Sequence, residues 1–261
     1  MAKYWAVFKT QLLNNLAYTG DLLSGSIAIV LFMWIFAQLW RVTYAAVGSS
    51  QIGGMRIHDT LWYLMLAEVI VLSKPRLARS IAQSVRDGSV AYLLNKPYNF
   101  LLYQCSVGLG DSLLRMVANV VAGGTIVWLL VGPPPNPLGW PLVLVAVTMA
   151  WLIDFCIAAM IGLAAFVTEE VRAFEWIYQK ILFILGGLLI PLDFYPSWLQ
   201  TVAKATPFAY TIYGPARLFV DPSMERFVML LLGQLLWLGI LAALLMLAYR
   251  RGVGQLAING G

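Results

Sequence analysis

Long apolar runs, separated by short polar stretches, make up most of this chain. A helix needs about 20 mostly apolar residues to cross the hydrocarbon core of a bilayer. We therefore predict six membrane-spanning helices, at residues 22–44, 58–73, 111–131, 140–167, 172–192 and 227–249. The predicted span at 58–73 is short and contains Glu68. The proline-rich segment 132–139 interrupts an uncharged run and divides two helices by a tight turn.

The residues before the first span form an amphipathic pattern. In residues 3–18 most apolar side chains share one broad helical face, and the polar ones lie away from it. This pattern predicts a helix that lies in the membrane–water interface before the chain enters the bilayer. The alternative is that this segment simply begins the first spanning helix.

Both ends of the chain are expected on one side of the membrane, because the predicted number of spans is even. Basic residues concentrate on the cytoplasmic side of membrane proteins. Eleven Lys and Arg residues fall on the side of the termini and five on the other, with Arg115 inside a helix. We therefore predict that both termini are cytoplasmic.

The composition agrees with a membrane protein. Hydrophobic residues make up 61% of the 261 residues and charged residues 11%, whereas soluble domains have about 45–50% and 25%. These values argue against a water-soluble enzyme, a disordered segment and a disulfide-stapled secreted module. The net charge of +5 does not indicate nucleic acid, because the basic residues are scattered between apolar runs. Anionic membrane lipid or an acidic partner at the membrane surface explains it better.

The sequence contains no recognisable catalytic or metal-binding set. It has no Gly-x-x-x-x-Gly-Lys-Ser/Thr loop for ATP phosphates, and its single histidine, His58, excludes a metal site built on histidine pairs. Cys105 and Cys156 lie in apolar stretches and fit no metal or redox spacing. We therefore expect no catalytic residue, no metal and no cofactor on this chain itself.

Four charged residues inside the predicted spans need an explanation, because an unpaired charge is costly in a bilayer. Asp111 and Arg115 are four residues apart, which places them on one face of a helix. Glu68 lies in the inner half of its span and Asp154 near the middle of its span. These residues either form local pairs and helix or subunit contacts, or they line a polar translocation path.

Residues 80–94, between the second and third predicted spans, have the pattern of an amphipathic helix–turn–helix. Apolar positions alternate with polar ones, a short Asp-Gly break follows, and a second apolar piece ends at a proline. The pattern predicts a cytoplasmic element that docks a soluble partner, with a membrane-surface helix as the alternative. Its candidate contact residues are Ile81, Val85, Arg86, Asp87, Gly88, Tyr92 and Leu93.

A second unusual segment, residues 186–216, lies on the outer side. It places glycines and prolines at the end of an apolar run and carries several aromatic residues. Irregular backbone at membrane depth occurs only where protein buries it or a water-filled cavity meets it. We therefore expect a helix that stops short, dips back and lies along the outer interface, with an external aromatic loop as the alternative. The candidate gate residues are Gly186, Gly187, Pro191, Pro196 and Trp198.

Three motifs in chain order resemble the ABC-2 type transporter permeases. Residues 186–200 read Gly-Gly-Leu-Leu-Ile-Pro-Leu-Asp-x-x-Pro-x-Trp-Leu-Gln, and Thr-Pro-Phe and Tyr-Gly-Pro-Ala follow, as in the outer re-entrant region of that family. Residues 85–97, Val-Arg-Asp-Gly-Ser-Val-Ala-Tyr-Leu-Leu-Asn-Lys-Pro, are similar to the cytoplasmic loop of one ABC-2 subfamily. Residues 249–252 and 258–261 resemble the ending of that subfamily, so the resemblance covers the whole chain.

The resemblance implies an all-α polytopic membrane protein with six spanning helices, an N-terminal interfacial helix, a cytoplasmic coupling helix and outer re-entrant helices. It implies a subunit of an ABC exporter in the bacterial plasma membrane, paired with a second permease chain as a homo- or heterodimer. Residues 80–94 would then contact a separate ATPase subunit that holds ATP and Mg²⁺. The substrate would be hydrophobic or amphipathic. The alternative function is a stand-alone ion-coupled transporter that uses Glu68, Asp111 and Asp154.

Overall fold

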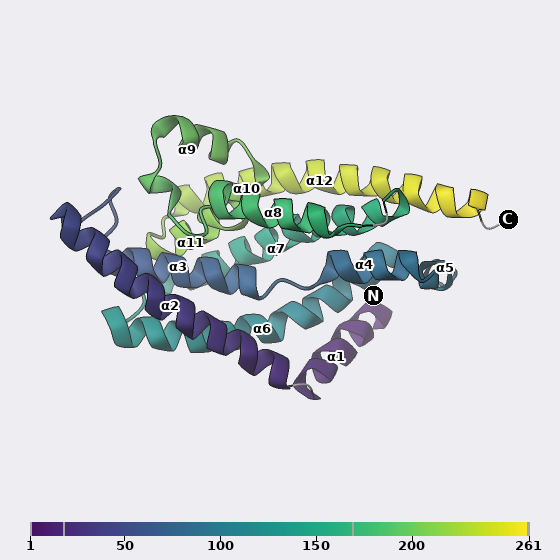
Figure 1. Ribbon diagram of the computed structural model, residues 1–261, viewed down its shortest axis with the longest axis horizontal. Coiled ribbons are helices and arrows are strands. Elements are labelled where there is room, and N and C mark those ends of the chain that lie inside the picture. The colour runs from purple at the N-terminus through teal and green to yellow at the C-terminus, as the bar shows by residue number, and fades with distance from the viewer. Residues whose placement is uncertain (1, 18, 169, 260–261) are drawn as a thin grey trace.

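The computed structural model describes residues 2–17, 19–168 and 170–259, and within these ranges the chain is helical and has no strand. Tyr18 of the predicted interfacial helix, and Gly260 and Gly261 of the C-terminal motif, lie outside these ranges. Elongated helices form the body of the molecule (Figure 1). They are α2 (Thr19–Val47), α3 (Ile57–Leu72), α6 (Phe100–Val131), α7 (Trp140–Leu163), α8 (Arg172–Leu185) and α12 (Met224–Asn259). The predicted all-helical class is confirmed.

The two ends of this bundle carry different short elements. One end holds α4 (Leu77–Arg86) and α5 (Ser89–Leu94), together with the start of α1 (Ala2–Ala17) and the end of α12 (Figure 1). The opposite end holds α9 (Ser197–Lys204). Both ends of the chain therefore lie on the same side of the molecule as the α4–α5 segment.

The elongated helices differ in length. Four of those in the described part of the chain are long and apolar enough to cross a membrane: Ser24–Val47, Phe100–Val131, Trp140–Phe166 and Met224–Gly254. α3 and α8 have 16 and 14 residues, which at about 1.5 Å per residue is less than the roughly 30 Å of a hydrocarbon core. The helices found at the predicted spans 58–73 and 172–192 are therefore too short to cross the hydrocarbon core without a break.

Three helices have ends that differ from the predicted span boundaries. α6 begins at Phe100 instead of residue 111, because Asn99 caps its first turn by accepting a hydrogen bond from the Leu102 N–H at 3.0 Å. α8 ends at Leu185 instead of residue 192, because Gly187 has a φ of +71° and cannot continue a right-handed helix. α12 continues past residue 249, since arginine is a good helix former in water.

α3 is the central helix of the bundle. Every residue from Thr60 to Ile70 is buried, and α2, α6 and α11 (Tyr213–Val220) pack around it. A helix that is apolar on all sides is stable only when other elements surround it. A second apolar cluster lies where α4, α7 and α12 meet. The core therefore connects the α4–α5 end of the molecule to its middle.

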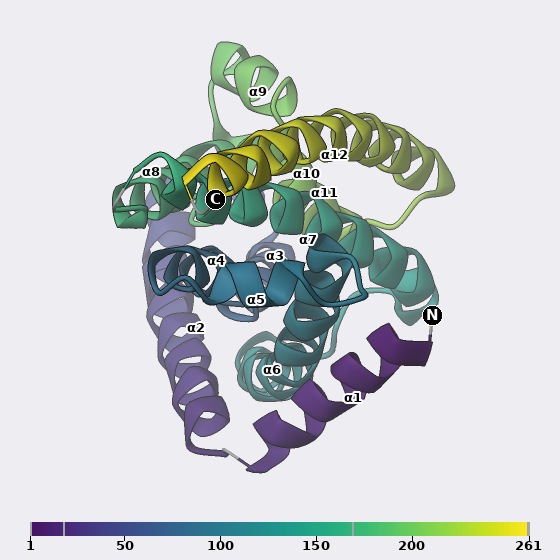
Figure 2. The same ribbon diagram turned by 90° about the vertical axis from the view of Figure 1, so that its right-hand side faces the viewer.

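α1 is a separate helix that packs across α6. Lys3 Nζ donates to the Pro97 carbonyl at 2.5 Å, and Asn15 donates to the Asp111 carboxylate at 3.2 Å. Figure 2 shows α1 at a wide angle to α2. The alternative in which this segment begins the first span is therefore wrong. Its position in the membrane interface stays a prediction.

Candidate functional site

The first candidate site is the hairpin formed by α4 and α5, which lies at one end of the molecule (Figure 1). Asp87 and Gly88 form its turn, and Gly88 has a φ of +75° that an L side chain rarely adopts. The Asp87 carboxylate accepts the Ser89 N–H at 3.0 Å and so satisfies the first backbone donor of α5. Hydrogen bonding from Ser89 lowers the pKa of Asp87, so this carboxyl is ionised at neutral pH.

One face of the hairpin is packed against the bundle. Ile81 is fully buried on α7, and Val85 and Leu93 pack against the same apolar cluster. α4 lies close to α7 at Gly162, where an added β carbon would lie 2.8 Å from Ile81 Cβ and 2.9 Å from the Ala78 carbonyl oxygen. Ile81 therefore holds the hairpin on the bundle and is not accessible to a partner, whereas Val85 and Leu93 are only partly buried and their contact with a partner stays a prediction.

The opposite face of the hairpin is exposed. Arg86, Asp87 and Gly88 are exposed, and Tyr92 has 67% of its surface exposed. The Lys96 ammonium lies 4.3 Å from the centre of the Tyr92 ring, which is within cation–π distance. The hairpin thus presents an aromatic ring beside both signs of charge, a combination that suits a protein partner.

The close approach at Gly162 makes a direct test of this packing possible. We expect Gly162→Ala to destabilise the protein by about 1–3 kcal/mol, because the added methyl group must push α4 away from α7. Gly124→Ala in α6 is the matched control, since its added β carbon meets no atom within 4 Å. The thermal unfolding midpoint in detergent measures both. Equal midpoints for the two variants would show that α4 does not rest on α7 at this position.

A buried ion pair lies at the base of the hairpin. Lys74, in the connection between α3 and α4, pairs with Asp154 of α7, and both side chains are largely buried. Tyr178 of α8 donates to the same carboxylate oxygen at 2.5 Å. The contact joins α7, α8 and the start of the hairpin. Asp154 is therefore a charge satisfied by a cation, and its contacts join three elements.

A second ion pair links α4 directly to α8. Arg79 Nε donates to Glu175 at 2.7 Å, and the Arg79 side chain is 59% exposed while that of Glu175 is 15% exposed. An ion pair that is open to solvent on one side contributes up to about 1 kcal/mol to stability. Its importance here is geometric, because it ties the hairpin to the first turn of α8.

The other charged residues predicted inside the membrane do not pair with residues of this junction. Arg115 pairs with Asp111 at 3.0 Å within α6, one helical turn away. Glu68 is 5% exposed, and no hydrogen bond or ion pair joins it to another described residue. The structure therefore gives Asp111 and Asp154 separate cationic partners, and only Glu68 is left without one in this part of the chain.

The C-terminal end of α8 is the second candidate site. Gly187 is buried, its carbonyl accepts a hydrogen bond from the Tyr63 hydroxyl of α3 at 2.7 Å, and an added β carbon would lie 2.8 Å from that hydroxyl. Of the other predicted gate residues, Gly186 and Pro191 are buried beside it, whereas Pro196 and Trp198 are exposed on the projecting α9. The predicted gate residues therefore lie in two places, a buried group just after α8 and an exposed group at the start of α9.

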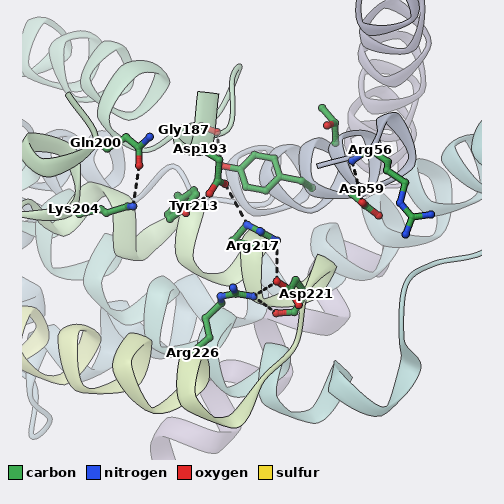
Figure 3. Close-up of polar contacts among 12 residues, drawn as sticks. Arg56, Asp59, Gly187, Asp193, Gln200, Lys204, Tyr213, Arg217, Asp221 and Arg226 are labelled. Carbon is green, nitrogen blue, oxygen red and sulfur yellow. Dashed lines mark hydrogen bonds and ion pairs between the residues drawn. The ribbon is translucent and has the colours of Figure 1, made fainter. Parts of the chain in front are cut away.

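A network of charged side chains holds the segment that follows α8 (Figure 3). Arg217 of α11 lies 3.3 Å from an oxygen of Asp193, as an ion pair without hydrogen-bond alignment, and 3.5 Å from Asp221. Arg226 at the start of α12 pairs with Asp221 at 2.6 Å. Tyr213 donates to Asp193 at 3.1 Å. The network fixes residues 186–196, called the outer loop from their predicted location, to α11 and α12.

The re-entrant prediction needs one correction. α10 (Pro207–Thr211) and α11 do not lie along the outer surface but pack against α7, α12 and, for α11, α3. Ala209, Thr211 and Ile212 are buried there. The reason is that these short helices carry apolar residues on the side facing the bundle, and burying them stabilises the fold.

A comparison with models of known families identifies the family of this chain. The family model described as ABC-2 family transporter protein matches residues 29–260, which extend from α2 to the end of the chain. The chain belongs to the ABC-2 transporter family. A search of individually curated proteins gives no match.

Membership explains several features of this ABC-2 protein. The family is a membrane component of a transport system and is not itself the ATPase, which agrees with a chain that lacks a nucleotide-binding loop. Within the described residues no group of three or more His, Cys, Asp or Glu side chains could hold a metal ion.

Several residues of both sites were not found from the sequence. At the hairpin these are Lys74, Arg79, Glu175 and Tyr178, and at the outer loop Tyr63, Asp193, Tyr213, Arg217, Asp221 and Arg226. Only the Arg217–Asp221 pair has the four-residue spacing that helix periodicity makes visible. The other partners come from different elements.

Proposed function

We propose that this chain is the permease subunit of an ATP-driven exporter and moves a hydrophobic or amphipathic substrate across the plasma membrane. The observation that carries the proposal is the α4–α5 hairpin. One of its faces is packed on α7, while the other exposes Arg86, Asp87 and Tyr92 at the end that also holds the termini. A separate ATPase subunit would dock on the exposed face.

The energy source in this proposal is ATP bound on the partner. The chain has no phosphate-binding loop, and the ABC-2 family supplies the membrane part of the transport system. ATP and Mg²⁺ would therefore bind to the ATPase subunit. The hairpin, both termini and the basic residues around them would face the cytoplasm, as the distribution of Lys and Arg supports.

The contacts of the hairpin offer a route from the ATPase to the transport pathway. α4 rests on α7 at Gly162 and is tied to α8 through Arg79 and Glu175. At its other end, α8 stops where Gly187 contacts Tyr63 of the central helix. A displacement of the hairpin would thus act on α7 and α8 together and reach the outer loop through α8.

The ion-coupled alternative receives less support. Such a transporter needs carboxylates that can bind and release an ion or proton during the cycle. Asp111 and Asp154 are already paired with Arg115 and Lys74. Only Glu68 remains without a partner among the described residues.

A second permease chain would complete the transporter. Apolar side chains on α2 remain exposed in the single chain, among them Trp34, Ile35 and Leu39. Contiguous apolar faces of this kind are covered either by lipid or by another helix bundle. Both a homodimer and a heterodimer fit this surface.

Docking of the ATPase provides the test of the proposed function. We expect the double variant Arg86→Ala, Tyr92→Ala to weaken association with the ATPase subunit by about 30-fold, because buried Tyr and Arg contacts contribute roughly 2 kcal/mol or more at interfaces. Co-purification of the ATPase from native membranes in mild detergent, followed by mass spectrometry, measures the association.

The matched control is Trp198→Ala. Trp198 is 66% exposed and therefore comparable to Tyr92, but it lies on α9 at the opposite end of the molecule. This variant should retain the ATPase. If the hairpin variant inserts normally and still retains the ATPase as well as the Trp198 variant does, the proposed docking surface is wrong.

A further inference from the structure

A cavity of about 400 Å³ lies between the start of α4, α7 and α8. Its volume falls in the range of about 300–1,000 Å³ that is typical of small-molecule sites. Charged side chains from α4, its preceding connection and α6 line one part of it, and these are Lys74, Arg76, Arg79 and Arg115. The carboxylates in the lining are those of Asp154 and Glu175. The wall of the cavity is therefore richer in cations than in anions.

Arg76 is the cation that the surrounding protein leaves available. Lys74, Arg79 and Arg115 each pair with a carboxylate, of Asp154, Glu175 and Asp111 respectively. Arg76 is exposed and has no ion pair with any described carboxylate. Arg79 donates to Glu175 through Nε, so its terminal amino groups remain free to bind a second anion. Two guanidinium groups can thus meet one anionic ligand.

Another part of the same cavity is apolar. Val71 and Leu72 from the end of α3, and Leu182 and Phe183 from the last turn of α8, line this part. A free inorganic anion would gain nothing from this wall, because an apolar surface is stabilised only by another apolar group. The ligand that matches both parts carries an anionic head and a hydrocarbon portion.

The surroundings of α8 place the cavity beside lipid. Phe174, Trp176 and Ile177 are 47–66% exposed on the faces of α8 that point away from the bundle. Lys180 Nζ lies 5.0 Å from the centre of the Trp176 ring, an aromatic and cationic combination typical of the membrane–water interface. A lipid headgroup at that depth could enter the cavity laterally, with its chains still in the bilayer.

We propose that this cavity binds the phosphate headgroup of an anionic phospholipid from the cytoplasmic leaflet. Arg76 and the free amino groups of Arg79 would hold the phosphate, and the wall formed by α3 and α8 would contact the first part of the acyl chains. Bidentate guanidinium contacts are well suited to phosphate oxygens. The site lies at the junction of the hairpin with α8, so a bound lipid adds a further link between them. The inference requires only that the protein is embedded in a membrane, and it stands or falls independently of ATPase docking.

Binding of a defined lipid to the purified full-length protein tests this site. In detergent, dioleoylphosphatidylglycerol is titrated against wild type and bound lipid is counted by native mass spectrometry, with dioleoylphosphatidylcholine as the zwitterionic comparison. We expect Arg76→Gln to weaken binding of the anionic lipid by about fivefold, because one basic residue near an anionic lipid contributes roughly that factor. Arg76→Lys should retain most of the affinity, since the charge is kept.

Arg172→Gln is the control, because its side chain is 75% exposed on α8 and outside the cavity. This variant should bind the lipid as wild type does. If Arg76→Gln and Arg172→Gln bind the anionic lipid equally well, the cavity is not the site and the proposal is wrong. If 10 mM inorganic phosphate displaces the lipid completely and stabilises wild type but not Arg76→Gln, the site binds free phosphate and the lipid assignment is overturned.

Discussion

Replacing Asp154 by alanine is expected to destabilise the folded protein by about 3–5 kcal/mol, the usual cost of removing one partner of a buried ion pair. The variant leaves the Lys74 ammonium, whose side chain is 17% exposed, without its carboxylate. It also removes the acceptor of the Tyr178 hydroxyl. Because this contact joins α7, α8 and the base of the hairpin, the loss affects all three elements.

The thermal unfolding midpoint of the detergent-solubilised protein measures this effect. Glu170→Gln is the control, because Glu170 is 54% exposed and its ion pair with the Arg172 guanidinium is 3.9 Å long. The amide oxygen of Gln can still accept the Arg172 N–H, which Glu170 accepts at 2.9 Å, so the change should cost at most about 1 kcal/mol. The double variant Lys74→Met, Asp154→Leu should recover most of the lost stability, since it leaves no unpaired charge. An Asp154→Ala midpoint equal to that of Glu170→Gln would show that the pair does not hold the junction.

Replacing Gly187 by alanine is the second change with a large expected effect. Its φ of +71° costs an L-residue about 1–2 kcal/mol. In addition, the new β carbon would lie 2.8 Å from the Tyr63 hydroxyl and 3.1 Å from Leu192 Cγ, in a buried position. Overpacking of this kind costs a further 1–3 kcal/mol or so. We therefore expect a total loss of about 2–5 kcal/mol and a weakened contact between the end of α8 and α3.

Gly54→Ala separates the two causes. Gly54 has a similar φ of +76°, but nothing lies within 4 Å of an added β carbon. This variant should lose only the backbone contribution, about 1–2 kcal/mol. Unfolding midpoints of the two variants, measured side by side, give the packing contribution as their difference. If both variants lose the same stability, the Tyr63 contact does not position the outer loop.

The hairpin shows what helix periodicity predicts from the sequence and what it leaves undetermined. The pattern in residues 80–94 indicates a helix, a turn and a second helix, and the structure has α4, the Asp87–Gly88 turn and α5 at these positions. Periodicity places Ile81 and Val85 on one face, but it does not say what covers that face. In the structure α7 covers it at Ile81, so this residue anchors the hairpin and Tyr92 remains for a partner.

Chain-local signals also explain the errors in the helix boundaries. The sequence predicts the third span at residues 111–131, with Asp111 in its first turn, whereas α6 begins at Phe100. Inside the bundle this carboxylate is paired with Arg115 and accepts a hydrogen bond from Asn15 of α1, so the helix continues through it. The capping side chain of Asn99 sets the true start. A charged residue therefore need not end a helix when a neighbouring side chain or another element supplies its partner.

The sequence by itself determined that this protein is a helical membrane protein of the ABC-2 type, and it predicted where the hairpin and the outer loop begin. Apolar runs of this length can satisfy their backbone hydrogen bonds only as helices in a bilayer, and pairs such as Asp111 and Arg115 follow from the helical repeat. Only the tertiary structure decided the contacts of Asp154 and of Gly187. Asp154 and Lys74 are 80 residues apart, and Gly187 and Tyr63 are 124 residues apart. Contacts over such separations depend on which helices pack together, and no periodicity along the chain encodes that choice.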